Sequence, residues 1–573
     1  MSLDRKTAAR VLREAAALLE VQGENVHRIR ALANASRIVE RIDGDLEALI
    51  ESGEILEIKG VGKGTVAILQ QLLAGEHPEI LIKAEQIVPL GVREMLLIPG
   101  LGPKKVRALW HELGLASIGE LEYACRENRL VELPGFGAKT QEKLIGAIRF
   151  ARASEQRRLI NEAWTEATEI ASSLCEIGGV ARVVAGGEVR RCCETVGSLE
   201  FVVTTDDKER VVAALSDLYP GIGPESPLRF SASTESGLQM TVRVVSAAET
   251  AISTLWATGS DGHLRSLAEL ALSTGLRLDE TGLWRGDVQI NCADEHALYE
   301  ALGCRWVAPE LREGEGEVER AITGTLPELV APEDLLGALH NHTTDSDGAA
   351  TVEEMAAAAR GLGWSFFGVA DHSPVASYAN GVSAERLREQ LRRIDEFNAS
   401  LAGFRIIKGI EADILSDGSL DIPEGCDDGL DYVVASVHSA FGLTEEAQTE
   451  RLVQAVSHPA CRILGHPTGR LLLARPGYSV DLDRVLSACV EHGVAVEINA
   501  SPYRLDLDWH WARRALDLGL KLIVNPDAHS TAALDDVRWG LAVARKAGAA
   551  AADLVNCSDI EEFLRNERVK SSG

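Results

Sequence analysis

The C-terminal part of the chain carries many side chains of the types that bind metal ions. Nine of the histidine, aspartate and glutamate residues after residue 339 stand in short segments such as LHNHTTDSDG, VADHSP and NPDAHS. They are His340, His342, Asp347, His372, Glu411, His438, His466, Asp527 and His529. Most of these segments follow an apolar, β-branched run, which predicts a strand that ends in a turn.

The residue types indicate the chemistry. Neutral imidazole and carboxylate groups together suit divalent cations such as Zn²⁺ and Mn²⁺, and nine ligands exceed what one cation uses. We therefore expect two or three cations, with Glu411 as a bridging ligand and Asp347, Glu411 and Asp527 as catalytic residues. Such a cluster lowers the pKa of a bound water to roughly 7 and holds the oxygens of a phosphodiester. The sequence predicts a multi-metal hydrolase.

Ligands from so many separate segments must be brought together by several strands. A barrel does this at the carboxyl ends of its strands. The segment from about Leu335 to the C-terminus resembles a PHP (polymerase and histidinol phosphatase) domain, because its H-x-H, S-D-G, D-H, E-A-D, single histidines and D-A-H stand in that family's order. The resemblance fills all nine ligand positions. It implies a distorted (β/α)7 barrel whose trinuclear Mn²⁺ or Zn²⁺ centre hydrolyses phosphate esters.

Two arginines in this region are candidate phosphate-binding residues. Arg470 follows the turn of His466, and Arg504 follows a predicted strand end. A guanidinium at such a place could hold a phosphate through two hydrogen bonds. A surface salt bridge is the alternative for each.

Length and composition limit the possible classes of protein. A chain of 573 residues is expected to form three to five domains. The ten cysteines form no C-x-x-C pair, which favours a reducing cytoplasm over a disulfide framework or a zinc finger. No uncharged apolar run is long enough to span a membrane, and no secretion leader is evident, so we expect a soluble protein without a membrane partner.

The charge distribution indicates where nucleic acid could bind. The formal net charge of −29 argues against a general polyanion binder. Acidic and basic residues nearly balance over residues 1–160, so the acidic excess lies in the remainder. Contacts with DNA that depend on charge are therefore expected in the N-terminal part.

Three segments of the N-terminal part repeat one pattern. Residues 56–69, 96–109 and 130–145 each contain apolar residues, then G-x-G, then a basic residue and a helix pattern. Glycine permits positive φ and a close approach of the backbone, so the amides of the turn can face a phosphate. The segments resemble helix-hairpin-helix motifs, which bind the DNA backbone without reading sequence. The predicted DNA-binding residues are Gly60, Gly62, Lys63, Gly100, Gly102, Lys104, Lys105, Gly135, Gly137 and Lys139. Ordinary helix packing with glycine C-caps is the alternative.

The whole chain resembles bacterial and archaeal family X DNA polymerases. The segment GGEVRRCCETVGSLEFVV at 186–203 matches the palm signature of that family, GLQMTVRVV at 237–245 matches a palm strand, and PELREGEGEVERA at 309–321 matches the end of its thumb. The resemblance implies a multidomain α/β protein with a helical N-terminal region, an α+β nucleotidyltransferase-like palm and thumb, and the barrel. The predicted domains are a helical DNA-binding domain with the first hairpin at 1–80, a fingers-like domain with further hairpins at 81–153, a degenerate palm at 154–248, a thumb at 249–318, a linker at 319–334 and the PHP domain at 335–573.

The predicted palm departs from the family at its catalytic positions. Where the family has three metal-binding aspartates, this chain has Ser198, Glu200 and Thr241. Nucleotidyl transfer requires two Mg²⁺ ions held by carboxylate oxygens, which one longer carboxylate cannot provide. Glu188 also replaces the serine of the family's G-S signature. We therefore expect an inactive polymerase site, in which Arg190 and Arg191 form structural pairs, with residual phosphate binding as the alternative.

These features favour a metal-dependent DNA phosphoesterase with a role in DNA repair. We expect 3′-5′ exonuclease activity, with abasic-site incision as a second activity, on DNA that has 3′ ends, gaps or abasic sites. One alternative is an active template-directed polymerase that uses the PHP domain for proofreading. Another is a non-catalytic scaffold that binds DNA ends.

Overall fold

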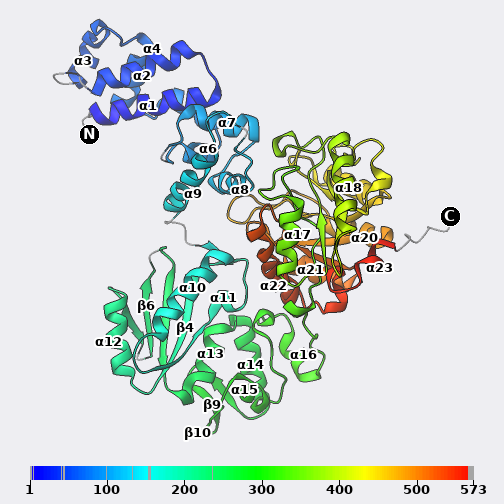
Figure 1. Ribbon diagram of the computed structural model, residues 1–573. Helices are drawn as coiled ribbons and strands as arrows, with labels where there is room; N and C mark the ends of the chain where they lie inside the picture. The colour runs from blue at the N-terminus through cyan, green and yellow to red at the C-terminus, as the bar shows by residue number, and fades with distance from the viewer. Residues whose placement is uncertain are drawn as a thin grey trace. The chain divides into compact units, whose positions relative to one another are not determined.

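The chain divides into two compact units, residues 1–152 and 153–573. The computed structural model (Figure 1) describes residues 3, 5–40, 42, 46–98, 100–131, 133–152, 157–226, 228–234 and 236–565. The predicted boundary between residues 153 and 154 lies outside the described residues, and the finer domain boundaries remain predictions. All ten cysteines are free thiols. None of the helices in the described ranges is both long and apolar enough to cross a bilayer.

The first unit is helical in its described residues. Its α-helices are α1 (Arg5–Gln22), α2 (Val26–Glu40), α3 (Leu46–Ser52), α4 (Lys63–Leu73), α5 (Glu79–Ile87), α6 (Leu90–Met95), α7 (Pro103–Leu113), α8 (Ile118–Arg126) and α9 (Ala138–Arg152). Apolar residues at helical spacing, such as Leu12, Leu69 and Leu109, are fully buried in one core. Burial of one face of each helix stabilises elements that are too short to be stable alone.

The second unit begins with a five-stranded sheet in the order β2-β4-β7-β6-β5. The strands are β2 (Val180–Ala185), β4 (Ser198–Thr205), β5 (Gly223–Ser226), β6 (Arg229–Ser233) and β7 (Gln239–Val245). Strands β4 and β7 are parallel, and Glu200 lies opposite Thr241. Three helices pack against this sheet, namely α10 (Ile160–Cys175), α12 (Lys208–Leu218) and α13 (Thr250–Thr258). Short elements β1 (Arg158–Leu159), α11 (Gly187–Arg190) and β3 (Thr195–Val196) complete this region.

A smaller mixed region follows, with its own apolar core. It consists of α14 (Asp261–Ser273), the antiparallel strands β8 (Arg277–Asp279), β9 (Gly282–Arg285) and β10 (Val288–Ile290), α15 (Glu295–Ala301) and α16 (Glu317–Thr323). This is the region predicted as the thumb.

The C-terminal region is built on a curled parallel sheet in which the strand order follows the chain order. The strands are β11 (Phe366–Val369), β12 (Arg405–Asp413), β13 (Tyr432–Ser436), β14 (Cys461–Leu464), β15 (Ala495–Asn499) and β16 (Leu522–Asn525). The helices are α17 (Val352–Gly361), α18 (Ala384–Asn398), α19 (Glu445–Ser457), α20 (Leu482–His492), α21 (Trp509–Asp517), α22 (Val537–Ala547) and α23 (Ile560–Arg565). Alternation of buried strands with amphipathic helices produces this sheet, whose carboxyl ends meet at one edge.

An irregular segment occupies the place of the predicted seventh strand. On one side, the amide of Gly368 donates to the carbonyl of Ala338 at 2.8 Å. On the other, the amide of His342 donates to the carbonyl of Ala528 at 2.9 Å. Residues 338–342 therefore connect β11 with the turn after β16, which explains why the barrel is distorted rather than built of seven regular strands.

The close packing of α22 against the sheet can be tested by a substitution at Gly540. A Cβ at Gly540 would lie 2.6 Å from the Cβ of Ala500 and 2.7 Å from Val524. Because two buried side chains must move, Gly540→Ala is expected to lower the free energy of unfolding by about 1–3 kcal/mol, measured by chemical denaturation.

Gly361 in α17 is the matched control, since a Cβ there would meet nothing within 4 Å. Gly361→Ala should leave stability unchanged or raise it by up to about 1 kcal/mol. Equal destabilisation by the two substitutions would contradict the close packing of α22.

Candidate metal centre and nucleic-acid contacts

The nine predicted ligands meet at the carboxyl edge of the C-terminal sheet. Glu411 lies in β12. His372 follows β11, His438 follows β13 and His466 follows β14. The remaining five ligands come from the turn after β16 and from the irregular segment and the loop that follows it. Most of the ligands form three groups, and within each group the ligand atoms lie within 4.8 Å of one another. The groups are His342, Asp347, His372 and His529; His340, His342 and Asp527; and His372, Glu411 and His438. Shared members make these groups one continuous cluster.

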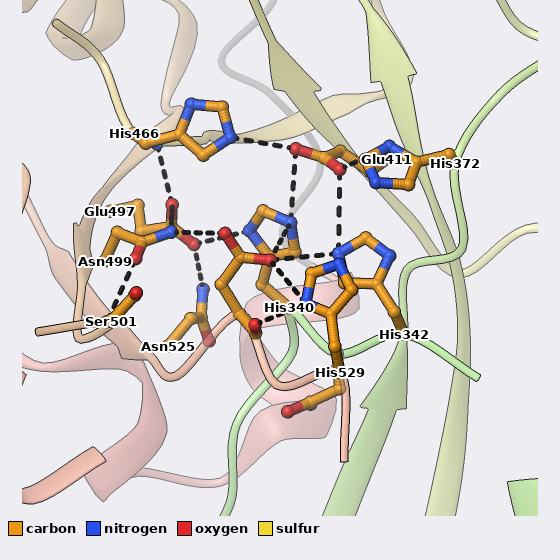
Figure 2. Close-up of polar contacts among 12 residues, drawn as sticks. His340, His342, His372, Glu411, His466, Glu497, Asn499, Ser501, Asn525 and His529 are labelled. Carbon is orange, nitrogen blue, oxygen red and sulfur yellow. Dashed lines mark hydrogen bonds and ion pairs between the residues drawn. The ribbon is translucent and has the colours of Figure 1, made fainter. Parts of the chain in front are cut away.

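Glu411 occupies the middle of the cluster, where it faces five imidazoles, of which Figure 2 shows those of His340, His342, His372 and His466. Its Oε1 lies 3.2 Å from Nε2 of His340, 3.2 Å from Nε2 of His438 and 3.1 Å from Nε2 of His466. Its Oε2 lies 2.9 Å from Nδ1 of His372. His466, which belongs to none of the three groups, is thus placed beside the cluster through Glu411. This position agrees with a bridging role for Glu411.

The other two carboxylates each face three histidines, two of which lie nearer than the third. Oδ1 of Asp527 lies 3.0 Å from Nε2 of His342 and 3.6 Å from Nε2 of His340. Oδ2 of Asp347 lies 3.5 Å from Nε2 of both His372 and His529. Each predicted catalytic carboxylate therefore has imidazole nitrogens within reach of a shared cation.

Burial and mutual attraction set the charges in the cluster. Burial opposes ionisation of Glu411, but the imidazoles of His438, His340 and His372 hold the pKa of its carboxyl well below the usual range. Burial also opposes protonation of His438, but Glu411 and Asp413 raise its pKa to about 9. Carboxylates in the cluster are therefore anionic at neutral pH.

His342 behaves differently from His438. Burial, together with repulsion from His529 and His372, lowers the pKa of His342 to about 4. Its imidazole is neutral at physiological pH, which is the form that binds metal ions.

A buried carboxylate that the sequence analysis missed orients two of the histidines. Glu497 in β15 is fully buried. It accepts a hydrogen bond from Nδ1 of His340 at 2.7 Å and one from the backbone amide of His466 at 2.7 Å (Figure 2). The amides of Asn525 and Asn499 also donate to it, at 3.0 and 3.2 Å. Glu497 thereby fixes which nitrogen of His340 faces Glu411.

Two further aspartates support the cluster from outside. Asp413 accepts a hydrogen bond from Nδ1 of His438. Asp371 accepts from the amide of Thr343 at 2.7 Å and so fixes the loop between His342 and Asp347. Their sequence signals were the acidic residues next to predicted ligands, in GIEADIL and VADHSP. The only sequence signal for Glu497 was its position as a charged residue in the mostly apolar run VAVEINA.

The arrangement fits a set of bound cations. Among the described residues, Nδ1 of His342 and Oδ2 of Asp347 are shielded from solvent and form no hydrogen bond. Burying such groups without a partner is costly, and a divalent cation would satisfy them. The backbone at Asp527 has a φ of 53°, a value that few residues with a side chain adopt.

The two predicted phosphate-binding arginines have protein partners. The guanidinium of Arg470 donates to the carboxylate of Glu194 at 2.6 Å and to the carbonyl of Arg504 at 3.0 Å. Arg504 is buried, with its Nε 3.8 Å from Oδ2 of Asp527. Arg504 thus lies beside the cluster, whereas Arg470 connects the cluster's supporting loop to the palm-like region. Phosphate binding by either residue remains a prediction.

The predicted degenerate polymerase positions lie together on the five-stranded sheet. Ser198 and Glu200 are on β4, and Thr241 is on β7. Oε2 of Glu200 lies 3.7 Å from Nε of Arg243, and Oε1 lies 3.9 Å from Nη2 of Arg229. Burial raises the pKa of Glu200 despite these arginines. Among the described residues, no metal-type group of three forms here.

The arginines of the palm signature form ion pairs. Arg190 donates to Oε2 of Glu295 at 2.6 Å, and Nε of Arg191 donates to Glu313 at 3.1 Å. Glu188 accepts from Nη2 of Arg157 at 2.8 Å and from the amide of Gly197 at 2.6 Å. These contacts agree with the structural pairing expected for Arg190 and Arg191.

The three G-x-G segments of the first unit share one backbone geometry. Gly60, Gly100 and Gly135 have φ values of 102°, 91° and 89°, which only glycine adopts readily. The second glycines of the first two segments, Gly62 and Gly102, are the N-caps of α4 and α7, without a side-chain cap. The amides of these helix starts are suited to bind phosphate.

The basic residues beside the hairpins differ in exposure. Lys63, Lys104 and Lys139 are exposed. Lys105 instead lies over the ring of Phe136, with Nζ 5.3 Å from its centroid, and connects the second hairpin to the third. Three of the four predicted lysines are therefore exposed enough to meet a DNA backbone.

Four family models match parts of the chain. A helix-hairpin-helix domain matches residues 4–78, and a SAM-like helix-hairpin-helix tandem matches residues 92–149. The DNA polymerase beta thumb matches residues 253–313, and the PHP domain matches residues 338–501. These matches confirm the predicted helix-hairpin-helix region, thumb and PHP domain.

Two kinds of relative are similar to the chain. The DNA polymerase/3′-5′ exonuclease PolX of Bacillus subtilis is 32% identical over 98% of this chain and 100% of its own length. A probable phosphatase of Thermoanaerobacter sp. (strain X514) is 31% identical over 41% of this chain and 96% of its own length. A probable phosphatase of Clostridium acetobutylicum is 31% identical over 33% of this chain. The first relative matches nearly the whole chain, and each of the other two matches less than half of it.

Substitution of Glu497 tests the support of the cluster. Glu497→Gln places an amide NH₂ where one of the two carboxylate oxygens accepts hydrogen bonds, so either His340 or His466 loses the contact that orients it. We expect the affinity for Mn²⁺ or Zn²⁺ to fall about 10- to 100-fold, measured by calorimetric titration and by metal content after dialysis.

The control is Glu491→Gln, which changes an exposed glutamate at the end of α20. It should bind metal as the unmodified protein does. Unchanged metal affinity in Glu497→Gln would contradict the supporting role of Glu497.

Proposed function

Because the chain belongs to the PolX family of DNA polymerases with a C-terminal PHP domain, we propose that it is a divalent-metal-dependent DNA phosphoesterase that shortens 3′ ends. The observation that carries this proposal is the continuous cluster of imidazoles and carboxylates around Glu411. The name of the Bacillus subtilis relative supports a 3′-5′ exonuclease. Incision at abasic sites is the second activity that we propose for the same cluster.

The proposed cofactors are two or three Mn²⁺ or Zn²⁺ ions. The residues that would hold them are His340, His342, Asp347, His372, Glu411, His438, His466, Asp527 and His529. When bound, the cations would acidify water and neutralise negative charge on the phosphodiester. Asp347, Glu411 and Asp527 would act as the catalytic carboxylates, and Arg504 would add positive charge next to Asp527.

The chain's own residues prepare the cluster for this chemistry. Glu497 and Asp413 accept hydrogen bonds from Nδ1 of His340 and His438, so that Nε2 of each ring faces Glu411. Burial of the ligands keeps bulk water away from the reacting atoms and strengthens electrostatic interactions there. The hairpins of the first unit would bind the DNA backbone without sequence preference.

We propose that the polymerase site is inactive. The support is the replacement of the family's aspartates by Ser198, Glu200 and Thr241, and the position of Glu200 between two arginines. Template-directed synthesis is the second candidate function, favoured by the name of the Bacillus subtilis relative. A role in DNA repair, a preference for 3′ ends, gaps or abasic sites, and a cytoplasmic location remain predictions.

A primer-shortening assay tests the proposed activity. A 5′-labelled recessed primer on a template is incubated with Mn²⁺, with and without all four nucleotides. We expect shortening that does not depend on nucleotides and that falls more than about 100-fold in Asp527→Ala, since this loss should exceed that of a supporting residue.

Asp517→Ala, an exposed aspartate at the end of α21, is the matched control and should shorten the primer normally. Shortening by Asp527→Ala at the normal rate would overturn the assignment to the PHP cluster. Extension of the primer would show that the palm is active.

DNA binding by the hairpins is tested through its salt dependence. Replacing the exposed Lys63 and Lys104 by alanine should weaken binding to all sequences equally. The slope of log affinity against log salt concentration should fall by about one for each lysine that contacts a phosphate, measured by fluorescence anisotropy. Lys83→Ala is the control, because Lys83 is exposed, lies in none of the three G-x-G segments and pairs with Glu79. An unchanged slope in the double variant would count against a hairpin contact with DNA.

A further inference from the structure

A short closed loop borders the metal centre between His372 and α18. Its ends are joined, because the amide of Val382 donates to the carbonyl of His372 at 2.8 Å. Gly381 makes this closure possible, since a Cβ there would lie 2.0 Å from the carbonyl oxygen of Ser373. The loop of residues 372–382 is therefore a tightly folded element at the rim of the cluster.

Contacts with neighbouring elements hold the loop in one position. Nδ2 of Asn380 donates to the carbonyl of Ser346 at 3.1 Å, beside Asp347. Nη1 of Arg386 in α18 donates to the carbonyl of Asn380 at 3.1 Å. A side chain carried by this loop is thus fixed relative to the metal ligands.

Tyr378 is the aromatic residue that the loop presents to the cluster. Its ring centroid lies 6.2 Å from that of His372 and 6.4 Å from that of His438, at interplanar angles of 61° and 68°. The two imidazoles belong to the group that contains Glu411. Tyr378 is half-buried, and its neighbour Val375 is 49% exposed. The ring therefore lies at the border between the buried ligands and solvent.

This position matches the needs of a nucleotide substrate. Imidazoles, carboxylates and their cations can hold a phosphodiester, but they offer no apolar face to the attached base. Every base has a π-face, and stacking on an aromatic side chain is tolerant of sequence. A ring about one base-width from the ligands, and partly open to solvent, provides such a face.

We propose that Tyr378 forms a nucleobase-binding subsite, in which the base next to the scissile phosphate stacks on its ring. This inference rests on the proposed DNA phosphoesterase function and adds a residue that positions the substrate. Stacking requires the ring and not the hydroxyl, so Tyr378→Phe keeps the subsite and Tyr378→Ala removes it.

The test compares two oligonucleotides that differ only in the base of the 3′-terminal nucleotide. One ends in deoxyadenosine, and the other ends in a tetrahydrofuran abasic analogue. On the first, Tyr378→Ala should lower kcat/KM about 5- to 100-fold, whereas Tyr378→Phe should stay close to the unmodified protein. On the abasic end, Tyr378→Ala should change kcat/KM by less than about twofold, because no base is present to stack. Val375→Ala, on the same loop, is the control and should not distinguish the two ends.

A binding measurement separates stacking from effects on the metal centre. An oligonucleotide with 2-aminopurine at its 3′ end, joined by a phosphorothioate to slow cleavage, should lose fluorescence when it binds the unmodified protein and Tyr378→Phe. Tyr378→Ala should bind it without this loss.

Three results would overturn the proposal. Tyr378→Ala could lower activity equally on both ends, which would mean that the residue supports the ligands instead. Tyr378→Ala could retain full activity and still quench the 2-aminopurine fluorescence, which would show that no base stacks on this residue. If the unmodified protein cleaves neither oligonucleotide, the proposed function fails and this inference fails with it, whereas cleavage without discrimination by Tyr378 overturns only the inference.

Discussion

The stability of the C-terminal region depends on how the charges that are buried in its metal-type cluster are compensated. Three carboxylates and six imidazoles converge at the edge of one sheet, and Glu411, His340 and His342 are almost completely shielded from solvent. Removing such groups from water is costly unless each has a partner of opposite charge or a cation. Glu411 has five imidazoles as partners, and Glu497 accepts hydrogen bonds from the imidazole of His340, the backbone amide of His466 and two asparagine amides. Cations in the cluster would satisfy the ligand atoms that the protein leaves without hydrogen bonds.

The five-stranded sheet meets the same constraint in a different way. Glu200 is also half-buried, but arginines and not imidazoles face it. The signature arginines Arg190 and Arg191 pair with Glu295 and Glu313. A carboxylate neutralised by guanidinium groups has less need for a metal ion, and one carboxylate supplies few of the oxygens that Mg²⁺ requires. The contrast supports our proposal that the chemistry resides in the PHP domain and that the helical first unit binds DNA.

The sequence predicted the metal-type residues because their positions follow a simple rule. In a parallel sheet, residues after successive strands lie at one edge, so polar residues after apolar runs at His372, His438 and His466 had to converge. The hairpin glycines were predictable for a similar reason, since the positive φ of Gly60 and Gly100 is a local property of the turn.

Features that depend on distant partners were not predictable. Glu497 lies inside a strand of apolar residues, and only the folded sheet reveals that it faces His340, 157 positions away. Arg470 had the sequence position of a phosphate ligand, but it contacts Glu194, 276 positions away. The predicted seventh strand became an irregular segment because its backbone bonds both to β11 and to the turn after β16. Each of these outcomes depends on tertiary contacts that no local pattern encodes.

The most direct test of the central claim is the location of bound metal. Crystals of the full chain soaked in Mn²⁺ can be measured at the manganese absorption edge. The account predicts two or three anomalous peaks enclosed by the side chains around Glu411, and none between Ser198, Glu200 and Thr241. A manganese peak in the palm, or a C-terminal cluster without any peak, would contradict it.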